Sequence, residues 1–573
     1  MIGLPDDNKK RSKKYGIGAI AAVLVVALLF CTNLFSYIRI AITSSESDVC
    51  PIIDIYRPKS FYKDNSTVHD IIFGKKFRKE SAEKMTKAVQ VDTQIYDDPP
   101  AVDDDPEYWK KFIKFHEYLE ETFPTVYENL EVTKVNTYGL VFYWKGTNPD
   151  LKPLMLAAHQ DVVPVQEDTV GDWTYPPFSG HFDGENLYGR GSVDCKNVLV
   201  SIMETFELLL SKNFTPERGV IAAFGMDEEV SGWHGAESIA HYLEKRFGKN
   251  SIYGIIDEGA GIATSPFTGG LVAMIGTGEK GYVDVDVFLT TPGGHSSMPP
   301  DYTSIGIVSE LAYAIEQDPF KPLLSEKNPT LGLLQCSAAH DHQGNLPKLL
   351  KKSILRAGYD KVANSIVVKA LAKHIASRYL IQTSQAMDII KGGEKNNALP
   401  ESVRLLVNHR VAIETEIDEV LKQFTDRVIR VAKKHDIGLI AFGEELLEPT
   451  AKGSFVLKVS GKITNTAPVT PKEDTLWNFI GGVTRHIFED YVFTDLKDPI
   501  VVAPSIMTGN TDTRHYWNLT DHIYRYSPMH YEDPIKDTKI HSVDEHLLYD
   551  NHLHMIAFFY EFIQSIQEHN SDA

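Results

Sequence analysis

Short apolar segments alternate with segments of helical periodicity over the first half of the chain. Residues 154–158, 220–224 and 252–256 have the length and composition of buried strands. Helical patterns separate them at residues 198–210 and 235–247. Apolar strands that alternate with helices are typical of an α/β sheet covered on both faces. We therefore expect an α/β catalytic domain with a central mixed sheet.

The pattern changes at about residue 281. Residues 282–289 alternate apolar and polar side chains, and helical and strand-like segments follow at 304–316, 403–412, 417–434 and 437–442. This order suits an α+β ferredoxin-like domain inserted into the first domain as a lid. The predicted divisions are a cytosolic tail (1–14), a transmembrane signal anchor (15–38), a luminal spacer (39–105), the catalytic domain (106–280 and 466–573) and the lid domain (281–465), whose long insert at about 320–395 has no assignment.

The N-terminal segment predicts a membrane anchor. Residues 15–38 carry no charged side chain. As a helix they would extend about 36 Å, enough to cross a hydrocarbon core about 30 Å thick. Basic residues precede the segment (Lys9, Lys10, Arg11, Lys13 and Lys14). Positive charge stays on the cytosolic side, so the N-terminal membrane helix would leave the rest of the chain in a lumen. A cleaved signal peptide is the alternative, but the apolar stretch is long for one and lacks a clear cleavage site.

Charge content narrows the classes of function, whereas the cysteine count does not fix the compartment. Acidic residues outnumber basic ones by 78 to 58, which disfavours nucleic-acid binding. The four cysteines, one of which is Cys31 in the apolar run, allow at most one luminal disulfide. Glycosylation sequons at Asn65, Asn213 and Asn518 agree with a luminal location.

Potential metal ligands follow the predicted strands directly. His159 and Asp161 follow the first strand, Asp227-Glu228-Glu229 the second, and Asp257-Glu258 the third, while Asp194 ends a glycine-rich turn before a helix. A lone His-x-Asp pair or acidic triplet is usually a surface feature. Here acids recur at three strand ends, where ligands of open α/β sheets bind. Such carboxylates would repel one another without a cation, and His with Asp and Glu suits zinc. Several carboxylates can hold two ions about 3.5–4 Å apart if one of them bridges.

These segments resemble the co-catalytic zinc peptidases, the family that includes aminoacylase and carnosinase. The resemblance covers roughly residues 105–570 and rests on five ordered motifs, at 159–164, 188–196, 227–229, 257–259 and 293–297. Within that family, the anchor and residues 509–516 most resemble the vacuolar carboxypeptidases of fungi.

The resemblance implies two Zn²⁺ per chain. One ion would be held by His159 and Asp257, and the other by Glu229 and His541, with Asp194 bridging both. The sequence does not choose between His541 and four other histidines, at positions 515, 522, 530 and 546.

The same resemblance assigns catalytic roles. Glu228 would be the general base that takes a proton from the attacking water, and Asp161 would orient His159 through its other ring nitrogen. Cys195 departs from an all-N/O ligand set, and we expect it to be a bystander. The family often has a cis peptide bond after the bridging Asp.

Substrate contacts follow from the resemblance as well. His295, from the lid, would donate to the oxyanion, and Asn397 would contact substrate from the same domain. Arg514 would pair with the substrate carboxylate near Gly509. Each of these residues also has a plainer explanation. His295 could be a loop histidine that only caps a turn, and Asn397 a turn asparagine. Arg514 could form an ion pair with Asp512 or Asp521.

The sequence predicts a membrane-anchored protein that faces a lumen, and the resemblance implies that it is a carboxypeptidase of the vacuole. It would hydrolyse the C-terminal bond of short peptides of the Gly-Xaa type. One alternative uses the same site as an amidohydrolase of N-acyl or N-fatty-acyl amino acids. Another is an inactive peptidase-like binding ectodomain, against which the complete residue set argues. The family often forms lid-mediated homodimers in which the histidine at the position of His295 reaches the neighbouring subunit. The insert at 320–395 could block or replace that interface.

Overall fold

The computed structural model describes residues 33–43, 49–265 and 268–569, together with residues 23, 25, 571 and 572. The predicted cytosolic tail at 1–14 and most of the predicted span at 15–38 lie outside these residues. Among the residues that are described, no helix is both long enough and apolar enough to cross a membrane.

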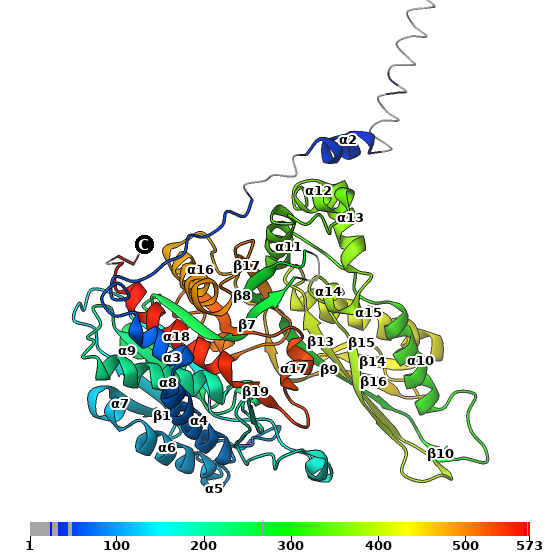
Figure 1. The fold of residues 1–573 in the computed structure, drawn as a ribbon. Helices are drawn as coiled ribbons and strands as arrows, with labels where there is room; N and C mark the ends of the chain where they lie inside the picture. Colours follow the sequence, from blue (N-terminus) through cyan, green and yellow to red (C-terminus); the bar gives the residue numbers. More distant parts are fainter. Residues whose placement is uncertain are drawn as a thin grey trace, which may run out of the picture.

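A mixed eight-stranded sheet forms the larger unit of the molecule (Figure 1) and confirms the α/β prediction. Its outer strands on one side pair antiparallel, whereas β6, β3, β7 and β18 run parallel. In spatial order the strands are β1 (Glu131–Val135), β2 (Gly139–Trp144), β6 (Val220–Gly225), β3 (Leu154–His159), β7 (Gly254–Thr264), β18 (Ile523–His530), β8 (Leu271–Glu279) and β17 (Val501–Met507).

Helices cover both faces of this sheet because its strands are apolar on both faces. Leu156 and Ala222 pack into the core on one face, and Met155 and Ile221 into the core on the other. The first face is covered by α3 (Ser66–Phe73), α4 (Lys75–Gln90), α6 (Lys111–Thr122), α7 (Pro124–Asn129), α8 (Lys196–Ser211), α16 (Thr475–Ile487) and α18 (Tyr549–Ile566), and the second by α9 (Ala236–Phe247). A small sheet of β4 (His181–Phe182), β5 (Asn186–Tyr188) and β19 (His546–Leu548) lies beside them, and α5 (Pro106–Trp109) and α17 (Pro534–Thr538) complete the unit.

The smaller unit is a second sheet with its own core, inserted between β8 and α16. Val285, Val287 and Leu405 of the sheet pack against Val420 and Phe424 of its long helix. In spatial order the strands are β11 (Ala386–Gly392), β13 (Ser402–Val411), β9 (Gly281–Thr290), β16 (Ser454–Thr464), β14 (Gly438–Ala441) and β15 (Glu444–Leu447), with helices α10 (Ser304–Gln317) and α15 (Ile417–His435) and a separate ribbon of β10 (Gly294–His295) and β12 (Ala398–Leu399).

The segment without a sequence assignment is a helical insert with a third core. Leu334, Ile354, Val367 and Leu371 pack together inside it. Its helices are α11 (Pro329–Ala339), α12 (Lys348–Ile354), α13 (Lys361–Leu371) and α14 (Ile375–Arg378). The insert contacts the larger sheet through α11, which packs on β17.

The prediction of a spacer at residues 39–105 is wrong for much of that range. Val68 and Ile71 of α3 and Met85 and Val89 of α4 are fully buried or nearly so in the main core. The buried Lys196 donates to the carbonyl oxygens of Ala88 and Val91 at 3.0 and 2.6 Å, which fixes the end of α4 to the start of α8. The polar residues of these helices form their solvent face, so the segment is part of the catalytic fold.

A disulfide joins the N-terminal part of the described chain to the insert. Cys50 and Cys336 of α11 are bonded to each other, and both are buried. His340 reinforces the junction through its Nε2, 2.7 Å from the carbonyl oxygen of Cys50. Because stable disulfides belong to oxidising compartments, this bond agrees with a luminal location.

Replacing both half-cystines by serine should lower the free energy of unfolding by about 2–4 kcal/mol, because the bond limits the unfolded chain. Thermal melting of C50S/C336S against the wild type measures the loss. Reducing agent should lower the wild-type melting temperature by a similar amount and leave the variant unchanged. A non-reduced digest without a Cys50–Cys336 peptide would contradict the assignment.

Candidate metal centre and substrate cleft

The loops after β3 and β6 are held together by Asp161. His159, the last residue of β3, is buried, and its Nδ1 lies 3.3 Å from Oδ1 of Asp161 and 3.0 Å from the Asp161 carbonyl oxygen. The same carboxylate accepts the backbone N–H groups of Glu228 and Glu229 at 3.2 and 3.0 Å. Asp161 therefore fixes the orientation of the His159 ring and the position of the acidic loop after β6.

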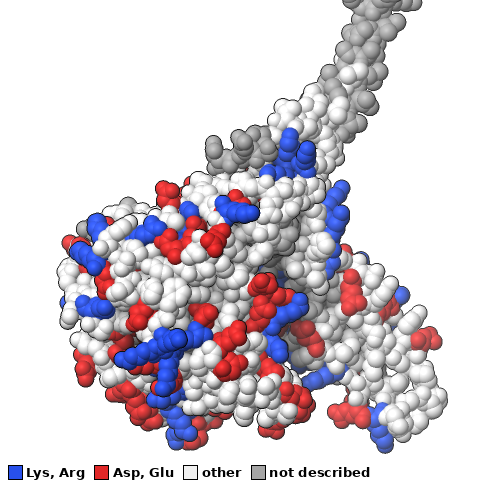
Figure 2. All heavy atoms as spheres, viewed as in Figure 1, with Lys and Arg blue, Asp and Glu red and all other residues white. Residues whose placement is uncertain are grey.

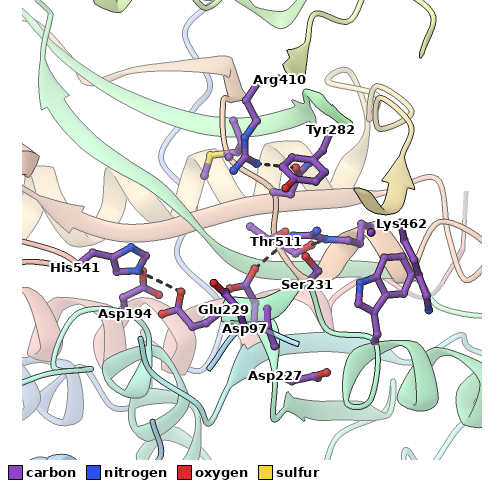
Figure 3. Close-up of a pocket in the computed structure, with 18 of the residues that line it drawn as sticks. Asp97, Asp194, Asp227, Glu229, Ser231, Tyr282, Arg410, Lys462, Thr511 and His541 are labelled. Carbon is purple, nitrogen blue, oxygen red and sulfur yellow. Dashed lines mark hydrogen bonds and ion pairs between the residues drawn. The ribbon is translucent and has the colours of Figure 1, made fainter. Parts of the chain in front are cut away.

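Asp194 lies between two groups of potential ligands. Its Oδ1 is 3.1 Å from Nε2 of His159, which in turn lies 3.5 Å from Oε1 of Glu258. Its Oδ2 is 3.1 Å from Nε2 of His541, which lies 3.3 Å from Oε2 of Glu229. Figure 3 shows His541, Asp194 and Glu229 together at one end of the cleft. The Asp194–Cys195 peptide bond is cis.

The electrostatics of the cluster favour a cation. Burial, and then the charge of Asp194, raises the pKa of Glu229 to about 7. Burial raises the pKa of Glu258 to about 7 as well. At Asp194 burial acts in the same direction, but hydrogen bonds from His159 and His541 outweigh it and lower the pKa. Carboxylates crowded into a buried site are stabilised in their charged form by a divalent ion.

The donor set fits zinc in two adjacent positions. His159, Asp194 and Glu258 form one group, and Asp194, Glu229 and His541 form the other, with the ligand atoms of each group within 4.8 Å of one another. Nitrogen and carboxylate oxygen donors suit catalytic zinc. The shared residue is a carboxylate with one oxygen toward each group, which is what a bridging ligand requires.

Asp257 does not occupy the position predicted for it. Its Oδ1 accepts the backbone N–H of Glu258 at 2.9 Å, and its buried Oδ2 has no hydrogen-bond partner among the described residues. Successive side chains of a strand point to opposite faces, so Asp257 and Glu258 of β7 cannot both face His159. The carboxylate beside His159 is that of Glu258, which corrects the position expected for Asp257.

Cys195 also lies in the His159 group. Its fully buried sulfur accepts the backbone N–H of His159 at 3.2 Å. Burial raises the pKa of this thiol well above its ordinary value. A neutral thiol is a weak ligand compared with the neighbouring carboxylates, because metals bind the thiolate.

Only one of the five C-terminal histidines considered approaches the acidic cluster. His541 lies within 3.3 Å of both Asp194 and Glu229. The others contact groups elsewhere: His515 the carbonyl oxygen of Ser231, His522 the carboxylate of Asp474, His530 the ring of Phe493, and His546 the carbonyl oxygen of Asp544. Of these histidines, His541 is the one placed to complete the second ligand group.

Glu228 belongs to neither ligand group. Its buried carboxyl lies 3.8 Å from Nη2 of Arg514, and burial raises its pKa well above the ordinary value. Arg514, in the 3₁₀ helix η4 (Asp512–His515), donates its Nε to the carbonyl oxygen of Thr511 at 3.0 Å. A carboxylate beside the cluster but outside both ligand groups is free to exchange a proton.

A cleft of about 1100 Å³ separates the two units and contains these groups. Arg514 and Gly509 line it from the larger unit, and Arg410 of β13 lines it from the smaller one. Sequence reasoning missed Arg410, whose guanidinium lies over the Tyr282 ring at 4.7 Å and donates to Oδ1 of Asn510 at 3.2 Å. The available signal was the polar run Asn408-His409-Arg410 at the end of a predicted strand.

His295 and Asn397 do not reach this cleft. His295 pairs with Ala398 in the β10–β12 ribbon, and Ser296 N–H donates to the Asn397 carbonyl oxygen at 3.3 Å. The ribbon is exposed at the far end of the smaller unit (Figure 1). The structure brings the two residues beside each other but places neither near Glu228 within this chain.

Comparisons with known proteins agree with the site. Residues 155–565 match the sequence pattern of peptidase family M20/M25/M40. The chain belongs to this family. Carboxypeptidase S of Saccharomyces cerevisiae is 39% identical over 91% of this chain and 90% of its own length. An N-fatty-acyl-amino acid synthase/hydrolase of Mus musculus is 30% identical over 79% of this chain and 82% of its own.

The fold is shared with solved members of the family. The M20 family metallo-carboxypeptidase Sso-CP2 from Sulfolobus solfataricus superposes with a TM-score of 0.57 at 15% identity, over 85% of this chain and 99% of its own. The chain is thus a carboxypeptidase S-like M20 enzyme, a zinc-dependent metallocarboxypeptidase, which confirms the predicted enzyme class.

Two variants on β7, E258Q and D257N, each replace one carboxylate by a neutral amide. Comparing them shows which of the two carboxylates binds metal. E258Q should lower the zinc content of the purified protein and abolish hydrolysis, because it removes a charged ligand from the His159 group. D257N should retain its zinc, because the Asp257 carboxylate supplies no ligand atom to either group. Metal analysis per chain decides between them, and the reverse pattern would restore Asp257 as the ligand.

Proposed function

We propose that this chain is a membrane-anchored, lumen-facing carboxypeptidase that uses two zinc ions to release the C-terminal residue of short Gly-Xaa peptides. The observation that carries the proposal is the position of Asp194, with one carboxylate oxygen toward each of two ligand groups, next to an unligated Glu228.

Two zinc ions would be held by His159 and Glu258 on one side and by Glu229 and His541 on the other, with Asp194 shared. When bound, they would supply a water of lowered pKa and polarise the carbonyl of the scissile bond. Asp161 contributes by keeping the His159 ring oriented through Nδ1, because a ligand that is fixed in advance loses less freedom on binding.

Glu228 is the group that moves the proton. Its carboxylate takes the proton of the attacking water as the new C–O bond forms at the scissile carbon. It then returns that proton to the amine nitrogen as the C–N bond breaks. The loop that bears Glu228 is fixed by the hydrogen bond from its backbone N–H to Asp161, so the carboxylate is held in place without being consumed as a ligand.

Recognition of a free C-terminus is assigned to two arginines on opposite sides of the cleft. Arg514 comes from the larger unit and Arg410 from the smaller one. Neither has a carboxylate partner within bidentate reach among the described residues, apart from Glu228 at 3.8 Å from Arg514. A substrate carboxylate offers guanidinium groups the planar partner that they lack.

A second candidate keeps the same site but changes the acyl side of the substrate. The mouse relative is named for N-fatty-acyl amino acids, which also end in a free carboxylate, and a cleft of about 1100 Å³ has room for a long chain. Comparing the turnover of Gly-Leu with that of an N-fatty-acyl leucine separates the two functions.

The compartment and assembly belong to the same proposal. Asn65, Asn213 and Asn518 are exposed, as glycosylation requires, and the buried Cys50–Cys336 bond suits an oxidising lumen. We assign the enzyme to the vacuole on its resemblance to fungal enzymes. The exposed β10–β12 ribbon would carry His295 and Asn397 to the cleft of a second subunit in a homodimer.

The E228Q variant should bind zinc normally and lose about 10²–10⁴-fold in kcat, because the amide accepts no proton. Metal analysis and Gly-Leu hydrolysis measure the two quantities. Near wild-type turnover with full zinc content would contradict the assignment of the base.

Replacing Arg514 or Arg410 by alanine should lower kcat/KM for Gly-Leu by about 10²-fold, since each removes a partner of the substrate carboxylate. Gly-Leu amide, which has no carboxylate, provides the control. Its slow hydrolysis by the wild type should be little changed in either variant. Equal losses for both substrates would mean that the arginines act on something other than the C-terminus.

A further inference from the structure

The helical insert carries a charge opposite to that of the rest of the protein. The whole chain has a net charge of −20, whereas the only acidic residue between positions 342 and 387 is Asp360. That residue is buried at the start of α13, where it accepts two backbone N–H groups. The basic residues of this stretch are Lys348, Lys351, Lys352, Arg356, Lys361, Lys369, Lys373 and Arg378.

Half of these basic side chains are exposed and unpaired among the residues that the structure describes. Lys348 on α12, Lys361 and Lys369 on α13, and Lys373 just after it are all exposed. None of the four makes an ion pair with another residue that the structure describes. Figure 2 shows basic side chains gathered on this part of the molecule. We call these four lysines the basic face.

The helix that contains the last residues of the predicted membrane segment at 15–38 is docked on the same insert. Ile40 of α2 (Leu34–Ile42) is fully buried, and α2 contacts both α12 and α13. Lys352 Nζ donates to the carbonyl oxygen of Ala41, and Arg39 Nη2 lies 3.6 Å from Oδ2 of Asp360. The insert therefore lies where the chain would leave a membrane.

The opposite side of α2 is apolar and exposed. Leu34 is 43% exposed, Ile38 47% and Ile42 76%. An apolar helix surface beside solvated lysines is the combination that places a helix in the headgroup layer of a membrane. The acidic body would be repelled by an anionic surface, so this face is the one that such a surface would attract.

We propose that the basic face of the insert binds anionic phospholipid headgroups of the membrane that holds the N-terminal segment, with α2 lying in the headgroup layer. This inference rests on the proposed membrane attachment and not on the peptidase reaction. Its consequence is a fixed orientation, in which the insert faces the membrane and the acidic surface of the larger unit faces away from it.

The experiment uses the full chain incorporated into vesicles, with a fluorophore at His374→Cys in a C31S background. The remaining cysteines do not interfere, because Cys195 is buried and Cys50 is bonded to Cys336. A lipid with a nitroxide headgroup quenches the fluorophore when the insert touches the surface. Vesicles of phosphatidylcholine alone are compared with vesicles that also contain phosphatidylserine.

Quenching should be strong only with phosphatidylserine and should be lost at high salt. The variant K348Q/K361Q/K369Q/K373Q should reduce the surface-bound population at least about fivefold, which is the contribution of a single lysine near an anionic surface. The matched control K75Q/K76Q/K79Q/K87Q removes the same charge from exposed lysines of α4 and should quench like the wild type.

Equal quenching in both lipids, or in the basic-face variant and the wild type, would overturn the inference. The same is true of a chain that enters vesicles without any quenching, as expected if the basic face binds an acidic protein instead. Vesicle flotation tests the anchor separately. A chain that floats with phosphatidylserine vesicles but not with neutral ones would contradict the anchor and support the basic face, and one that floats with neither would contradict both.

Discussion

The carboxylate of Asp194 faces two sets of donors at once, and most of the site is arranged around that fact. His159 and Glu258 approach one oxygen, and His541 approaches the other. So much negative charge in a buried place is tolerable only if it is balanced, either by protons, as the raised pKa values of Glu229 and Glu258 indicate, or by cations. The histidines of the site and the metal ions of the family both balance the negative charge of these buried carboxylates.

The sequence could predict those parts of the fold and site that depend on strand ends. His159, Asp194 and Glu229 each follow an apolar segment or a glycine-rich turn, and parallel strands bring such positions to a common edge. The central mixed sheet was predictable for a different reason, because its strands are apolar on both faces. The inserted second sheet was indicated by a change from continuous to alternating apolar pattern, as in Val283, Val285 and Val287.

The sequence could not predict which face of a strand each side chain occupies, or which distant segments pack together. Choosing Glu258 over Asp257 requires knowing which face of β7 each residue occupies. Arg410 becomes a cleft residue only because β13 aligns beside β9, and His295 leaves the cleft because its ribbon extends outward. The helices α3 and α4 were missed because their polar faces resemble a spacer until α8 and α18 are present to bury the other side.

The position of β18 has a consequence for biosynthesis. This strand lies between β7 and β8 in the interior of the larger sheet, yet it is translated after the entire smaller unit and its helical insert. The nascent chain must therefore hold an unfinished sheet, with open strand edges, until the ribosome has passed residue 530. His541 emerges later still, so the second group of potential ligands is completed only when synthesis is almost finished. Unpaired strand edges of this kind are prone to aggregation, and non-local strand pairing is intrinsically slow.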